Sequence, residues 1–141
     1  MDMTALWFAK LGAVMCVFYA GANIFQLWAR FEEVRQRAQQ FATIAGDPAN
    51  AARLVWIRSL FYFGIPVAFI VIFFGAGLPA GFLLASGCKF SMSAGLGLRA
   101  ERRVLAGNDY RSLDHRLSRL DALLNLMVAA AAVLLLLERK Y

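Results

Sequence analysis

Apolar residues fill four long runs of the chain, and charged residues collect between these runs. The runs cover residues 5–29, 58–76, 78–98 and 120–137. A helix needs about 20 apolar residues to cross a membrane, and the four runs meet or approach this length. The pattern therefore predicts an all-α membrane protein, in which residues 1–141 form one integral membrane domain built as a four-transmembrane-helix bundle.

The segment between the first two runs predicts a helix outside the membrane, because the apolar positions of residues 31–44 fall on one helical face. Gly46-Asp47-Pro48 is expected to end it. Asp47 is a suitable N-cap and Pro48 a suitable first residue for the next helix. Pro66 predicts a kink within the second run. The short turn at residues 75–79 makes the second and third helices antiparallel neighbours.

Arginine is unevenly distributed between the connections. Residues 30–58 and 99–119 are rich in arginine, whereas the turn at 75–79 has none. Cytoplasmic loops are enriched in Lys and Arg, so both basic loops are expected in the cytoplasm and both termini outside. Trp7 and Trp28 lie near opposite ends of the first run, as interfacial tryptophans do. The first run is interpreted as a retained helix, because it is too long for the apolar region of a signal peptide. The expected location is the bacterial inner (cytoplasmic) membrane.

Composition narrows the function classes. The chain is 61% hydrophobic, so membrane lipids are the expected partners. Its net charge of +6 follows from the arginines of the cytoplasmic loops, so the charge does not indicate nucleic-acid binding. Cys16 and Cys88 lie in apolar runs without CxxC spacing, which favours two small buried hydrophobes over a metal or redox site. The sequence has no recognisable catalytic motif, and neither a metal nor a cofactor is expected.

Lys89 is the leading candidate for a functional side chain. It lies ten residues before Arg99, which places it about 15 Å deep and near the midplane. An ionisable residue at this depth indicates a functional site by default. Away from their ends the runs contain no Asp or Glu, so Lys89 is expected to lack an intramembrane carboxylate partner in its own chain. It is either a ligand or transport residue, or a structural lysine held by Ser86, Ser93 and backbone carbonyls.

A second polar set is expected toward the cytoplasmic end. Asn23 and Gln26 share one face of the first helix with Tyr19, and Tyr62 and Asn125 lie at a similar depth. These residues either line a pocket open to the cytoplasm or form hydrogen bonds between helices.

Small residues on the third helix predict close helix packing. Gly87, Ser91 and Gly95 repeat every four residues, and Gly81 belongs to a similar repeat. This spacing lets helix backbones approach closely, so the third helix is expected inside a bundle.

The layout resembles the MAPEG family of four-helix membrane enzymes. Gly46-Asp47-Pro48, followed by Arg53, Arg58 and Pro66, is similar in order to the family's approach into its second helix, and Arg119-Leu120 is similar to the start of its fourth. The family's Asn and Glu would fall near Leu60 and Phe63, and its Arg-x-x-His meets Cys88 and Ser91. The resemblance implies a trimerising bundle that lacks most glutathione-handling residues.

Three functions remain open from the sequence. The first is a non-enzymatic accessory subunit or homo-oligomer with a polar intramembrane site on the third helix, for transport or for an anionic or lipid ligand. The second is a MAPEG-like enzyme for a lipophilic or thiol substrate. The third is an immunity or assembly factor that binds another membrane protein.

Overall fold

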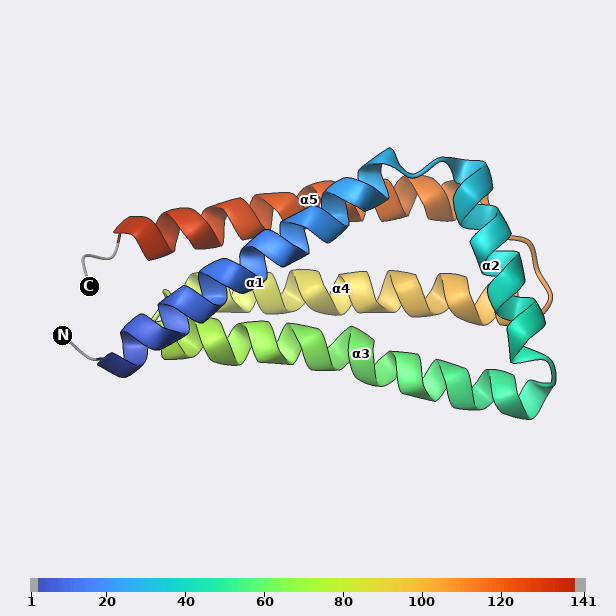
Figure 1. Cartoon of the computed structure of the whole chain (residues 1–141), viewed down its shortest axis with the longest axis horizontal. Helices are drawn as coiled ribbons and strands as arrows, with labels where there is room; N and C mark the ends of the chain where they lie inside the picture. The colour runs from blue at the N-terminus through green and yellow to red at the C-terminus, as the bar shows by residue number, and fades with distance from the viewer. Residues whose placement is uncertain (1–2, 139–141) are drawn as a thin grey trace.

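Five helices make up residues 3–138, the part of the chain that the computed structural model describes. They are α1 (Met3–Trp28), α2 (Phe31–Ala45), α3 (Pro48–Gly75), α4 (Ala80–Leu105) and α5 (Ser112–Glu138), and these described residues include no strand. The four long helices form a bundle, and α2 crosses one end of it (Figure 1). The predicted all-α architecture is confirmed.

The boundary between α2 and α3 follows the predicted signals. The Asp47 side chain accepts a hydrogen bond from the backbone amide of Asn50 at 2.8 Å, and Pro48 is the first residue of α3. Gly46 has a φ of 67°, a conformation that glycine adopts without strain. The chain can therefore turn sharply from the crossing helix into the bundle.

Three helices extend beyond the apolar runs inside them. α3 begins at Pro48, well before the predicted run at 58–76, and includes Pro66. α4 continues past residue 98 to Leu105, and α5 begins at Ser112 rather than at residue 120. These charged extensions are helical, and they place polar side chains near α2.

Three of the helices are long and apolar enough to cross a membrane. α1, α3 and α5 contain windows of mean hydropathy 1.6, 2.1 and 2.4, and α4 does not reach this level. Three such helices indicate a membrane-embedded protein. The two arginine-rich segments meet at the end covered by α2, and the α3–α4 turn lies at the other end (Figure 1).

The path of α1 determines where the bundle is tightly packed. Near its start α1 packs on α3, where Phe8 lies against Gly75 and Gly12 against Phe73. It then crosses the bundle toward α5, as Figure 1 shows, and Gln26 near its end donates to Ser118 of α5. The core is therefore continuous at the end away from α2, and the helices are spread apart beneath α2.

Candidate functional site

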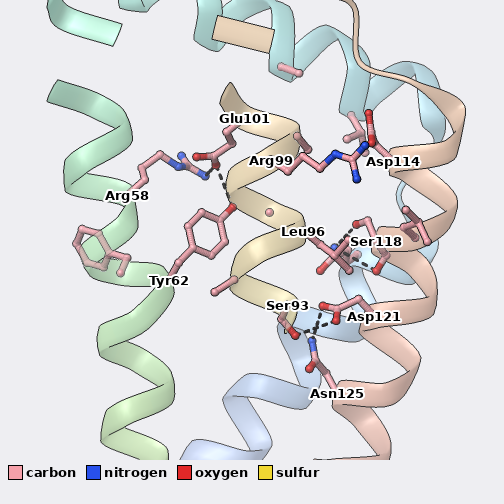
Figure 2. A pocket seen from close by; sticks show the side chains of 18 of the residues that line it. Arg58, Tyr62, Ser93, Leu96, Arg99, Glu101, Asp114, Ser118, Asp121 and Asn125 are labelled. Carbon is pink, nitrogen blue, oxygen red and sulfur yellow. Dashed lines mark hydrogen bonds and ion pairs between the residues drawn. The ribbon is translucent and has the colours of Figure 1, made fainter. Parts of the chain in front are cut away.

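A cavity of about 670 Å³ lies beneath α2 and is lined by residues from all five helices. This volume is within the range of sites that hold small organic ligands. Figure 2 shows α4 between α3 and α5, with α2 across the top. Aromatic rings form much of the wall, among them Tyr19, Phe61, Phe69 and Phe90.

An ion pair between α4 and α5 borders the cavity, with Asp121 in its lining and Lys89 behind it. Lys89 Nζ is 2.9 Å from Asp121 Oδ1, and both side chains are largely buried. Lys89 also donates to Ser93 Oγ at 2.7 Å and to Asn125 Oδ1. The expectation that Lys89 lacks a carboxylate partner in its own chain is therefore wrong. Asp121 lies near the start of the fourth apolar run, and the helical geometry of α5 brings it to the level of Lys89.

The ion pair continues into a hydrogen-bond chain that reaches α1. Asn125 Nδ2 donates to Asp121 Oδ2 at 3.2 Å and to Asn23 Oδ1 at 2.8 Å. Asn23 in turn donates to the carbonyl of Tyr19 at 2.7 Å. Three helices are thus joined through buried polar groups, and such a network specifies one arrangement of the helices when its members are satisfied.

A second ionic cluster forms the wall between α3 and α4. Glu101 Oε1 lies 2.7 Å from Arg58 Nη2 and accepts a hydrogen bond of 2.9 Å from the Tyr62 hydroxyl. Both partners point from α3 toward Glu101 in Figure 2. The Tyr62 ring lies over Gly97, where a Cβ atom would come within 2.7 Å of it, so glycine is required for this close approach. Glu101 Oε2 is buried and has no hydrogen-bond partner within residues 3–138.

The roof of the cavity is α2, which is attached to its neighbours on several sides. The Arg37 guanidinium lies 5.6 Å from the Phe25 ring of α1, and Arg58 of α3 lies 5.1 Å from the Phe41 ring. Asp109, in the connection between α4 and α5, accepts hydrogen bonds from Arg35 and Gln39 at 3.3 and 3.2 Å.

The cavity has more cations than its carboxylates neutralise. Asp121 is paired with Lys89, Glu101 with Arg58, and Asp114 with Arg103 at 3.5 Å. The ion pairs found among the described residues leave Arg37, Arg99 and Arg111 of the lining without a carboxylate. Burial, and then the nearby Asp114 carboxylate, raise the pKa of the Tyr110 phenol, which also lines the cavity. Tyr110 therefore stays protonated at neutral pH and can donate a hydrogen bond.

The structure brings most of the predicted polar residues to this cavity. Asn23, Gln26, Tyr62, Ser93 and Asn125 all belong to the lining. Lys89 does not line the cavity but lies behind Ser93 and Asp121. Ser86 is buried elsewhere on α4, and its hydroxyl has no partner in the described part of the chain. Lys89 is thus held by Ser93 and by the backbone carbonyl of Asp121, as the structural alternative predicted. The Asp121 carboxylate and Asn125 take the place of Ser86.

The small residues of α4 lie mainly away from the other helices. A Cβ atom at Gly81 or Gly95 would meet nothing within 4 Å, and one at Gly87 would only touch Ile70. Ser91 is exposed on the same side. These residues therefore do not produce close helix packing within one chain, and packing against a second copy stays a prediction.

The cysteines differ in burial. Cys16 is buried in the core, but Cys88 is exposed on α4, so the prediction of two buried cysteines is wrong for Cys88. Both are free thiols. Residues 3–138 contain no group of three side chains from His, Cys, Asp and Glu placed to hold a metal ion.

Several site residues were not found from the sequence, chiefly Asp121, Ser118, Glu101 and the lining arginines. One usable signal was present: Lys89 and Ser93 are four residues apart, as are Asp121 and Asn125, and each pair therefore shares a helical face. Glu101 and Arg99 gave no such signal, because they lie in what the apolar pattern predicted as a loop.

Comparisons with known proteins found no matching family model, no similar curated protein and no similar solved structure. The resemblance to the MAPEG family therefore stays a prediction.

Proposed function

We propose that this protein spans the membrane four times and binds a lipophilic anion in the cavity beneath α2. The observation that carries the proposal is the character of the lining: aromatic and aliphatic walls combined with three guanidinium groups that form no ion pair with a carboxylate of residues 3–138. Apolar surface favours a hydrocarbon group, and planar guanidinium groups favour phosphate or carboxylate. A molecule with both parts satisfies both kinds of surface.

In this arrangement α4 is the fourth span. Its mean hydropathy is lowered by polar residues such as Lys89 and Ser93, which are turned inward and bonded to Asp121 of α5. Ionisable residues in membrane helices usually face the bundle interior in this way. With α4 included, both arginine-rich segments are expected on the cytoplasmic side.

Two arginines test the anion-binding part of the proposal. Arg99 and Arg111 line the cavity, and the Arg99→Gln/Arg111→Gln variant keeps long polar side chains but removes both positive charges. A hydrogen bond to a charged group contributes about 1.5–3 kcal/mol, so the double variant should lower the affinity for an anionic amphiphile by at least about tenfold. Binding of dodecyl phosphate to the delipidated protein in a non-ionic detergent, measured by calorimetry, gives this comparison.

Arg102 on α4 and Arg116 on α5 provide a matched control, because they lie close in sequence to Arg99 and Arg111. Arg102 and Arg116 are exposed and do not line the cavity. The Arg102→Gln/Arg116→Gln variant therefore loses the same charge and should bind dodecyl phosphate as the unaltered protein does. Equal losses in the two double variants would mean that general surface charge attracts the anion, and the cavity would not be its site.

A further inference from the structure

We propose that the anionic ligand is a membrane lipid, and that it enters sideways from the bilayer through an opening between α1 and α3. This inference rests on the proposed function, because it names the source and the route of the ligand in the same cavity. The opening is defined by the divergence of two helices, by the residues at its edge and by the attachment of α2 above it.

The two helices that form the opening touch only over part of their length. They are in contact from Phe8 and Gly75 to Tyr19 and Phe69, whose ring centroids are 5.1 Å apart. Beyond this pair α1 crosses toward α5, as Figure 1 shows, and Gln26 bonds to Ser118 of α5. The space between α1 and α3 therefore widens from the Tyr19–Phe69 pair toward α2.

The residues at this widening belong to both the cavity and the surface. Phe61 and Ile65 of α3 line the cavity and are 64% and 48% exposed, and Ala22 of α1 lines it and is exposed as well. A residue with both properties marks a place where the cavity opens. The exposed arginines of the lining mark a polar opening beneath α2, whereas the opening at Phe61 and Ile65 is apolar. Phe61 and Ile65 follow Arg58 by about 4.5 and 10.5 Å along the helix axis. With Arg58 at the membrane surface, the opening lies at the level of lipid chains.

The attachment of α2 makes entry from above less direct. Arg37 packs on Phe25 at the α1 side, and Arg58 packs on Phe41 at the α3 side. Asp109 holds α2 to the connection between α4 and α5. Because the side opening is apolar and α2 is attached above the cavity, a ligand that is already in the bilayer is favoured. Its anionic headgroup would lie at Arg99 and Arg111, and its chain at the α1–α3 opening.

Photolabelling within a bilayer tests the route. The protein is reconstituted in nanodiscs of phosphatidylcholine and phosphatidylglycerol that contain a phosphatidylglycerol with a photoreactive group on its acyl chain. We expect labelled residues on the cavity side of α1 and α3, around Tyr19 and Phe69. Bulky residues at the opening, in the variant Ala22→Trp/Ile65→Trp, should remove most of this cavity labelling. Val67 is 60% exposed on α3 and does not line the cavity, so Val67→Trp should leave the labelling unchanged.

Two results would overturn the inference, and each differs from failure of the proposed function. If the blocked variant is labelled in the cavity as strongly as Val67→Trp, the lipid does not enter between α1 and α3. If glycerophosphoglycerol, which has the headgroup but no chains, suppresses the labelling at concentrations comparable to those of the lipid, the site takes a water-soluble anion. Failure of the proposed function appears instead as absent dodecyl phosphate binding in detergent, where the bilayer route plays no part.

Discussion

Changing Lys89 to Met should lower the free energy of unfolding by about 3–5 kcal/mol, because it leaves the Asp121 carboxylate buried without its cation. The Lys89 and Asp121 side chains are only 11% and 13% exposed, so water compensates little for the loss. Ser93 and Asn125 would still contact the carboxylate, but neither carries a positive charge. Reversible unfolding of the purified protein in mixed micelles, with increasing dodecyl sulfate, measures this change.

A double variant distinguishes the contribution of the ion pair to stability from the contribution of side-chain packing at the same position. Replacing both charged residues, in Lys89→Met/Asp121→Leu, removes the unpaired charge and should restore most of the lost stability. A loss as large as that of Lys89→Met alone would show that the aliphatic part of Lys89, and not the neutralisation of Asp121, is what stabilises the bundle. A Lys89→Met protein as stable as the unaltered one would contradict the ion pair itself.

Filling the cavity should abolish ligand binding without removing any charge. Leu96 lies on α4 and lines the cavity between the two ionic clusters (Figure 2). Trp at this position adds a large ring to the space that the ligand needs, so Leu96→Trp should weaken dodecyl phosphate binding by at least about a hundredfold, the loss of roughly 3 kcal/mol. Calorimetry in non-ionic detergent measures the affinity, and thermal unfolding of the same samples shows whether the fold is retained.

Leu84 offers the same substitution on the outer face of the same helix. It is 72% exposed and does not line the cavity, so Leu84→Trp should bind dodecyl phosphate normally. Normal binding by a folded Leu96→Trp protein would place the ligand somewhere other than this cavity. Loss of binding by Leu84→Trp would indicate a site on the outward side of α4.

The apolar pattern predicted the helices well because it depends on local properties of the chain. A few neighbouring residues suffice to predict the N-cap at Asp47 and the amphipathic helix α2. The extension of α4 to Leu105 was not, because the apolar pattern marks only where a helix is apolar and not where its backbone ends. Charged residues that continue a helix beyond such a run look like loop residues in the sequence.

The site was predicted less completely, because it depends on how helices cross. Asn23 and Asn125 were placed at a common depth from the sequence, and they are hydrogen-bonded. The pairing of Lys89 with Asp121 and of Arg58 with Glu101 required the rotation and spacing of neighbouring helices, which residue spacing alone does not specify. The crossing of α1 from α3 to α5, which leaves room for the cavity, also had no counterpart in the apolar pattern.

The central claim is that the cavity beneath α2 holds an anionic amphiphile, and native mass spectrometry of the protein released from its membrane tests it most directly. We predict one retained anionic lipid per chain, kept by Arg102→Gln/Arg116→Gln and lost by both Arg99→Gln/Arg111→Gln and Leu96→Trp. Lipid retained to the same extent by all four proteins, or by none of them, would contradict the claim.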